Sequence, residues 1–178
     1  MKSCRTFCLA PSRLASRVKR VIRQLDLDLS GLTVLTEAAT RAYSVTPVLA
    51  ACANASTVYA LARDSSYGSA DEAETDVMEL AEKAGAKSRI HLVNTLPSAI
   101  IKEADIVTNS GHLRPIKMDL ISQLKSTSVI SLMYATWEYR EGDIDIVACT
   151  DCQIPVIGSN ECHPDVAVFD YLGMMAVK

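Results

Sequence analysis

Short apolar runs alternate along this chain with segments of helical periodicity, and this alternation is the feature that most limits its fold. The apolar runs lie at residues 32–35, 57–62, 90–93, 105–108, 129–133 and 154–157. Each is nearly continuous in apolar residues, which is typical of strands that are buried on both faces and therefore pair in parallel. Parallel strands joined by right-handed crossovers predict an α/β fold, a three-layer doubly wound Rossmann-like sheet of about six strands.

Helical segments fill the intervals between the runs. They are expected at residues 47–54, 71–84, 97–103 and 118–124, with a short turn or helix at 143–148. Thr46 is a suitable N-cap and Pro47 suits a first helical position, so a helix is expected to begin there. Gly85 follows the acidic segment 71–84 where a C-cap glycine belongs.

The first 25 residues are basic, although the chain carries a formal net charge of -3. Three interpretations compete: a targeting peptide, an arm that binds anions or nucleic acid, and the solvated face of an ordinary helix. We favour a basic amphipathic N-terminal helix, because apolar residues recur there at helical spacing. These residues are Leu14, Val18, Val21, Ile22 and Leu25. The acidic remainder argues against a nucleic-acid-binding protein, and no apolar run approaches the roughly 20 residues that cross a bilayer.

One domain is expected to include residues 1–178, with a helical segment within 1–29 and a C-terminal helix at 164–178. That last helix either leads into a further part or forms a homo-oligomer interface. The six cysteines are expected to be reduced thiols in a cytoplasmic protein. The pair Cys149 and Cys152 and the pair Cys162 and His163 have zinc-ligand residue types, but the intervening apolar strand would hold the pairs apart. No bound metal is therefore expected.

The residues that follow each strand supply the candidate ligand site, because ligands of a doubly wound sheet lie outside the carboxyl ends of its strands. The candidate cofactor-binding residues are Thr36, Glu37, Thr40, Arg41 and Ser44 after the first strand, Arg63, Asp64 and Ser65 after the second, and Thr108, Asn109 and Ser110 after the fourth. Asp64 suits the hydroxyls of an adenosine ribose, whereas Arg63 and Ser65 suit a 2′-phosphate, so NAD and NADP both remain open. A purely structural alternative is that Asp64 caps a turn before Gly68.

The first of these loops departs from the usual dinucleotide-binding pattern. A G-x-G-x-x-G sequence normally follows the first strand, because glycine lets the backbone approach the pyrophosphate. Residues 36–47 contain no glycine. The loop therefore either holds a phosphate through side chains such as Arg41, Ser44 and Thr46, or is only a structural connection.

Titratable groups at the same edge are candidates for acid/base chemistry, which needs a tunable pKa in a cleft. The candidate catalytic residues are His112, Glu138 and His163, with Glu161 as a further group. The candidate substrate-binding residues are Arg114, Arg140, Asn160 and Glu161, since guanidinium groups clamp carboxylates and phosphates. His91 lies within an apolar run and is expected to be a satisfied structural residue.

An Asp-led apolar run, a small polar turn, a helical segment and a second apolar run follow one another at 104–111, 116–124 and 128–132. This part of the chain, residues 104–158, resembles the second half of the NAD-binding domain of D-2-hydroxyacid dehydrogenases and S-adenosylhomocysteine hydrolases. The resemblance implies that Thr108, Asn109 and Ser110 lie beside the cofactor. His163 with Pro164 is similar, in inverted order, to the Pro-His pair after the last strand of the hydroxyacid dehydrogenases.

Three functions remain open from the sequence. The first is a nucleotide-binding protein that takes NAD or NADP and acts as an oxidoreductase on a small polar, carboxylate or phosphate metabolite. The second is a Rossmann-like enzyme that uses S-adenosylmethionine or a phosphorylated metabolite, which the absent glycines favour. The third is a non-catalytic assembly or regulatory subunit with the C-terminal helix as its interface. Small molecules and a second copy are the expected partners, without nucleic acid or membrane.

Overall fold

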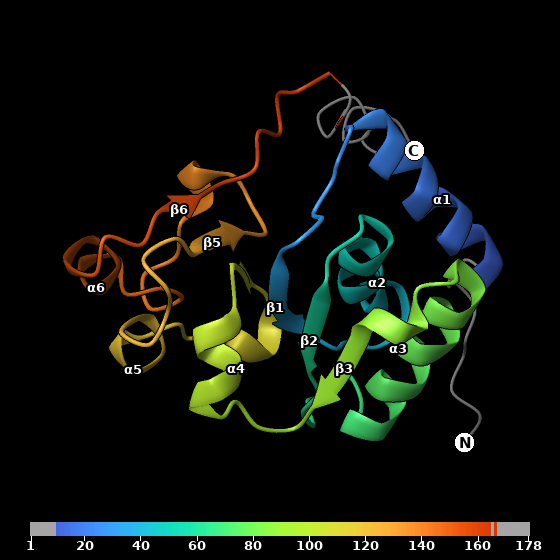
Figure 1. The fold of residues 1–178 in the computed structure, drawn as a ribbon, viewed down its shortest axis with the longest axis horizontal. Helices are drawn as coiled ribbons and strands as arrows, with labels where there is room; N and C mark the ends of the chain where they lie inside the picture. Colours follow the sequence, from blue (N-terminus) through green and yellow to red (C-terminus); the bar gives the residue numbers. More distant parts are fainter. Residues whose placement is uncertain (1–9, 165, 167–178) are drawn as a thin grey trace.

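The computed structural model describes residues 10–164 and 166, and these residues form a six-stranded parallel sheet with helices on both faces (Figure 1). The strands are β1 Thr33–Glu37, β2 Thr57–Leu61, β3 Ile90–Val93, β4 Ile106–Asn109, β5 Val129–Leu132 and β6 Val156–Ile157. Their order across the sheet is β3-β2-β1-β4-β5-β6, with every neighbouring pair parallel. This is the doubly wound order of the Rossmann fold, so the expected fold class is confirmed.

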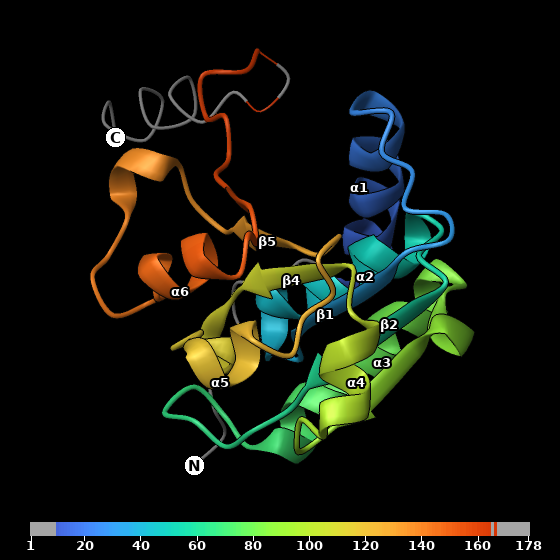
Figure 2. The ribbon, with the colours of Figure 1, turned by 60° about the vertical axis from the view of Figure 1, so that its left-hand side comes forward.

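The helices form two groups because successive residues of a strand point to opposite faces of the sheet. Val34 of β1 belongs to the hydrophobic core beneath α1 Pro11–Gln24, α2 Val45–Cys52 and α3 Ala70–Ala84, whereas its neighbour Leu35 belongs to the second core. The second core lies beneath α4 Ser98–Glu103, α5 Met118–Ile121 and α6 Ile146–Asp151. Figures 1 and 2 both show α5 and α6 beside β5, at the opposite end of the molecule from α1 and α3.

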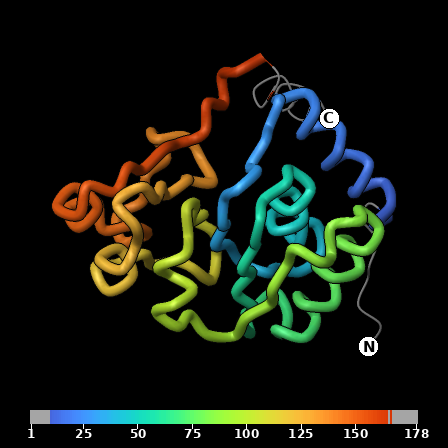
Figure 3. The backbone as a smooth tube through the Cα atoms, viewed as in Figure 1, coloured from blue at the N-terminus to red at the C-terminus, as the bar shows by residue number. Residues whose placement is uncertain are grey.

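The two longest helices have the boundaries that their sequences favour. In α1, Ala15 and Val18 are buried and the basic side chains are exposed, as a solvated basic face requires. The tube in Figure 3 shows α1 joined to β1 by the extended residues that follow it, so this helix precedes the alternation of strands and helices. In α3, Ser69 and Glu72 form a capping box, and Gly85 ends the helix in the left-handed conformation with φ 74°.

Several expected boundaries are wrong. The helix α2 begins at Val45 and not after a Thr46 cap, because the 3-10 turn η1 Arg41–Ser44 leads directly into it and Pro47 lies within its first turn, where a missing N–H is tolerated. The helix α5 ends at Ile121, three residues earlier than expected, and α6 begins and ends three residues later. The side chain of Leu25, expected in the buried stripe of α1, is 44% exposed because the helix ends before it.

The outer strands are less covered than the sequence indicates. His91 on β3 is exposed, with its ring centroid 5.7 Å from that of Tyr59, because β3 is an edge strand. The other edge strand, β6, contains only Val156 and Ile157, and Ile157 is 57% exposed.

None of the helices in the described residues is long and apolar enough to cross a membrane. The C-terminal helix expected at 164–178 falls almost entirely outside the described residues.

Candidate functional site

The order of the strands places a topological switch point at the carboxyl end of the sheet between β1 and β4. From β1 the chain proceeds outward to β2 and β3, then returns to β4 on the other side of β1. The connections that leave β1 and β4 therefore run in opposite directions, and ligands of open α/β sheets bind at this switch point. Four short 3-10 turns occur in the described residues. Three of them follow strands: η1 follows β1, η3 Gly111–Leu113 follows β4, and η4 Thr136–Glu138 follows β5. The fourth, η2 Lys87–Arg89, precedes β3.

A chain of three hydroxyl groups lies at this switch point. The pairing of Val34 with Ile106 and of Leu35 with Val107 brings the next residues, Thr36 and Thr108, side by side. Thr108 Oγ1 donates to Thr36 Oγ1 at 2.7 Å and lies 2.8 Å from Ser110 Oγ. Because Thr108 has one hydroxyl hydrogen and gives it to Thr36, Ser110 is the donor in the second bond. All three side chains are buried, so these predicted cofactor residues form one connected group.

Glu37 connects the end of β1 with the turn after β4. It is the last residue of β1, and its Oε2 accepts the backbone N–H of His112 in η3 at 2.9 Å. Gly111 makes this approach possible, since a Cβ at that position would lie 2.1 Å from Glu37 Oε2. The sequence placed Glu37 and His112 at the same edge but gave no reason to join them, because 75 residues separate them.

The glycine-free loop after β1 is held in place from α3. Arg41 has φ 58°, a left-handed conformation that glycine adopts more readily, and its backbone N–H donates to Asp76 Oδ2 at 2.6 Å. Ser44 is buried and its hydroxyl donates to the carbonyl oxygen of Arg41 at 2.7 Å. The side chain of Arg41 is exposed, and that of Thr40 is half-buried.

The loop after β2 is closed by its own contacts. Asp64 Oδ1 accepts the backbone N–H of Ala70, at the start of α3, at 2.9 Å. This contact is similar in kind to the structural alternative, in which Asp64 caps a turn before Gly68. Ser65 and Gly68 are joined by backbone hydrogen bonds, and Gly68 packs so closely on Thr40 that a Cβ there would lie 2.8 Å from Thr40 Cγ2. Arg63, Asp64 and Ser65 are all exposed, so they remain reachable by a ligand.

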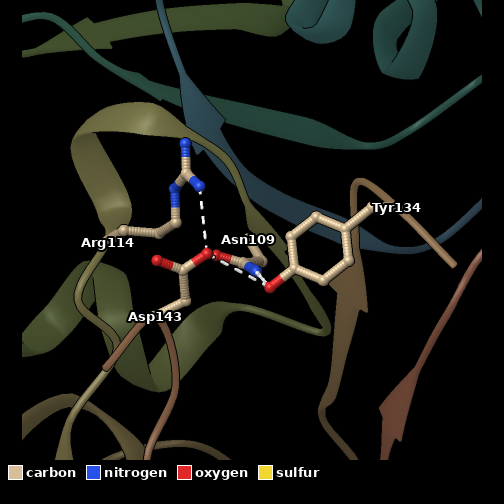
Figure 4. Close-up of polar contacts among 4 residues, drawn as sticks. All are labelled: Asn109, Arg114, Tyr134 and Asp143. Carbon is tan, nitrogen blue, oxygen red and sulfur yellow. Dashed lines mark hydrogen bonds and ion pairs between the residues drawn. The ribbon is translucent and has the colours of Figure 1, made fainter. Parts of the chain in front are cut away.

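A second polar network lies beside the switch point, at the carboxyl ends of β4 and β5 (Figure 4). Asn109 Nδ2 donates to the Tyr134 hydroxyl at 2.8 Å, and that hydroxyl donates to Asp143 Oδ2 at 3.2 Å. Arg114 also donates to Asp143 Oδ2, at 3.0 Å. Burial, followed by the hydrogen bond to Asp143 and the charge of that carboxylate, raises the pKa of Tyr134 and keeps the phenol protonated.

The amide of Asn109 leaves one buried acceptor without a partner. Tyr134 gives its single hydrogen to Asp143, so it can only accept from Asn109, and this fixes which end of the amide faces it. Asn109 Oδ1 is then the only buried side-chain nitrogen or oxygen without a hydrogen-bond partner among the described residues. Because such atoms are rare in folded proteins, an N–H or O–H of a ligand is a chemically suitable partner.

One member of this network, Asp143, was not among the candidate site residues. Asp143 follows no strand and is brought to Arg114 by an isolated parallel bridge between Ile116 and Ile144. The alternation of Asp and Ile from 143 to 146 was a local signal for such extended backbone.

The remaining candidate residues lie in the turns after β4, β5 and β6. His112 and Glu138 are half-buried in η3 and η4, and the Arg140 guanidinium carbon lies 5.7 Å from the centroid of the Tyr134 ring. Beyond β6, Asn160 and His163 are exposed and Glu161 is half-buried. The structure thus joins candidates after β1 and β4 by hydrogen bonds, and the hydrogen bond from the Ser159 N–H to the Tyr134 carbonyl brings the turn after β6 to the end of β5.

No group of three or more His, Cys, Asp or Glu residues within the described ranges is arranged to hold a metal ion. Cys149 is buried on α6, and burial, aided by Asp145 and Cys152, raises the pKa of its thiol to about 11. The thiol is therefore protonated near neutral pH and packs as a small apolar group.

No protein-family model matches this sequence, and no curated protein is similar to it in sequence. Its fold, however, matches solved structures. A dipicolinate synthase chain from Bacillus halodurans is 12% identical with a TM-score of 0.56, and the match covers 94% of this chain and 52% of that one. Shikimate 5-dehydrogenase from Listeria monocytogenes, solved with shikimate and NAD, is 10% identical with a TM-score of 0.55, and the match covers 91% and 61% of the two chains.

Shikimate 5-dehydrogenase from Mycobacterium fortuitum is similar to the same extent, with 14% identity, a TM-score of 0.54, and 85% and 55% of the chains covered. The fold is a Rossmann fold. The chain spans between 52% and 61% of the length of these structures. The architecture implied by the resemblance in residues 104–158 is thereby confirmed.

Proposed function

We propose that this chain binds an adenosine-containing nucleotide at the carboxyl edge of its sheet, with a nicotinamide dinucleotide, NAD or NADP, as the first candidate. The observation that carries the proposal is the β1/β4 switch point at the carboxyl edge of the sheet, where the hydroxyl groups of Thr36, Thr108 and Ser110 are joined. The fold shared with a shikimate 5-dehydrogenase solved with NAD supports this choice of ligand.

The unpaired Asn109 Oδ1 supports a ligand that brings a hydrogen-bond donor to the end of β4. A ribose hydroxyl or a carboxamide N–H fits that requirement, and a nicotinamide nucleotide carries both. Asp64, exposed at the end of the loop after β2, is positioned to accept from an adenosine ribose through the carboxylate oxygen that does not bind the Ala70 amide.

An oxidoreductase acting on a small polar, carboxylate or phosphate metabolite is the proposed reaction class. His112, Glu138 and His163 are the proposed acid/base groups, and Arg114, Arg140, Asn160 and Glu161 the proposed substrate contacts. The Arg114 side chain retains 32% exposure while paired with Asp143, so its guanidinium can still present donors to an anionic substrate.

S-adenosylmethionine is the second candidate ligand, and one observation favours it specifically. Residues 36–47 contain no glycine, and Glu37 holds a carboxylate between the end of β1 and the turn after β4, the region where a dinucleotide's pyrophosphate would lie if it bound here. A ligand with a sulfonium in place of the pyrophosphate meets no repulsion from that carboxylate.

A thermal-shift titration with NAD, NADH, NADP, NADPH and S-adenosylmethionine tests the proposal. A ligand present at 100 times its dissociation constant adds about 2.7 kcal/mol of stability. Asp64→Asn should reduce the ligand-induced shift, because asparagine still accepts the Ala70 N–H but no longer offers a carboxylate to the ribose. Glu79 is an exposed residue of α3. Glu79→Gln removes the same charge at a distance from the switch point and should leave the ligand-induced thermal shift unchanged.

Trp137 gives an independent readout, because it is the only tryptophan of the chain and lies in η4 after β5, with 71% exposure. Bound NADH should quench its emission and accept its excitation energy, and Trp137→Phe is the control. Absence of a shift and of quenching with every ligand would reject nucleotide binding at this edge.

A further inference from the structure

Two backbone amides that face the carboxyl edge already have carboxylate partners from the protein. Glu37 accepts the N–H of His112 after β4, and Asp76 accepts the N–H of Arg41 after β1. In dinucleotide-binding folds, backbone N–H groups of such loops bind the phosphates of the ligand. The positions of two anions are thus filled by side chains before any ligand binds.

Of the two carboxylates, Glu37 is the one that spans the switch point. It extends from the end of β1 to η3 after β4, the two strands that Thr36 and Thr108 also join. Asp76, in contrast, holds the β1–α2 connection from the side of α3. A ligand bound at the switch point would therefore lie beside the Glu37 carboxylate.

The contact of Glu37 with η3 depends on a glycine. A Cβ on Gly111 would lie 2.1 Å from Glu37 Oε2 and 2.9 Å from its Cδ, so any other residue at this position would displace the carboxylate. Gly111 does not have a positive φ, so its backbone alone does not require glycine. The missing side chain is needed for the close approach of the carboxylate.

We propose that Glu37 determines ligand specificity at the switch point, because its carboxylate occupies the place that a ligand phosphate would take. This inference rests on the proposed nucleotide site and deepens it. A pyrophosphate must displace the carboxylate from the His112 amide or remain beside a like charge. An adenosyl ligand with a neutral or cationic group at this place binds without either cost. The dinucleotide proposed above therefore binds less tightly than it would without the Glu37 charge.

The test compares adenosine, ADP, NADH and S-adenosylmethionine by isothermal titration calorimetry on the unmodified chain and on Glu37→Gln. Glutamine can still accept the His112 N–H, so only the charge is removed. Affinity for ADP and NADH should rise about tenfold or more, because a like charge a few ångströms from a phosphate is costly even at protein-surface dielectric. Adenosine affinity should not change, and Glu79→Gln should resemble the unmodified chain for every ligand.

Gly111→Ala tests the contact itself, because the added methyl group takes the place of the carboxylate without removing its charge. The amide hydrogen of His112 should exchange with solvent faster in Gly111→Ala than in Glu37→Gln, and equal exchange would overturn the assigned contact. Equal changes in ADP and adenosine affinity in Glu37→Gln would overturn the role of Glu37 while leaving the nucleotide site intact. Failure of all four ligands to bind either protein would reject both.

Discussion

Replacing Thr108 by valine should destabilise the protein because two neighbouring hydroxyl groups, those of Thr36 and Ser110, lose their hydrogen-bond partner. Thr108 is 8% exposed, and its hydroxyl links Thr36 to Ser110 across β1 and β4. Valine keeps nearly the same shape but leaves Thr36 without its donor and Ser110 without its acceptor. A buried polar group left unsatisfied costs about 1–3 kcal/mol, and this range is the expected loss in the free energy of unfolding.

Two effects set the size of that loss. Valine is favoured in strands by a few tenths of a kcal/mol relative to many residues, so strand propensity reduces the measured cost slightly. For a domain of this size each kcal/mol lowers the melting temperature by about 2–4 °C. Urea unfolding followed by circular dichroism gives the free energy directly, provided that the slope with denaturant is unchanged. Thr127→Val, at an exposed turn position, is the matched control and should change stability by about 0.5 kcal/mol or less.

The double variant Thr36→Val with Thr108→Val separates lost hydrogen bonds from altered packing. When both partners become apolar, little remains unsatisfied between them, so the double variant should be more stable than the sum of the single losses predicts. A coupling of about 0.5–3 kcal/mol is expected for groups in direct contact. Strict additivity, or a Thr108→Val protein as stable as the Thr127→Val control, would refute the argument.

Three further substitutions test single contacts. Arg41→Gly should raise stability by about 1 kcal/mol or less, measured by urea unfolding, because glycine adopts φ 58° without strain but gains freedom in the unfolded chain. Ser69→Ala should cost about 0.5–2 kcal/mol in the same assay, since it removes the N-cap of α3. Burial would raise the pKa of Asp105, but the hydrogen bonds from Lys125 and the Thr33 amide, with the lysine charge, outweigh it and lower that pKa. Unfolding therefore takes up protons below about pH 4, so Asp105→Asn should show a weaker loss of stability than the unmodified chain on acidification through this range.

The parts of the fold that the sequence predicts are those whose signals are local. Gly85 follows the helical segment 71–84 as a C-cap glycine, and the helix α3 Ala70–Ala84 forms where expected. The parallel order of the strands follows from apolar runs and crossover handedness, which need no knowledge of individual contacts.

The predicted start of α2 is wrong because the contacts that set the true start are not local in sequence. The 3-10 turn before α2 places Arg41 in a left-handed conformation, and the acceptor for its N–H is Asp76, 35 residues away on α3. No periodicity in residues 36–47 could reveal that partner. The same holds for Asp143, which joins the polar network only through a bridge between residues distant in sequence.

The distribution of carboxylates explains how a loop without glycine can keep its place at this edge. In a glycine-rich loop the backbone amides are exposed to the ligand, and a bound phosphate satisfies them. Here Glu37, Asp64 and Asp76 satisfy one amide each, in the turn after β4, at the start of α3 and in the loop after β1. The loops are therefore closed by the protein itself, without requiring an anionic ligand. A ligand phosphate that binds one of these amides must then displace a carboxylate and gains only the difference between two anions on one amide.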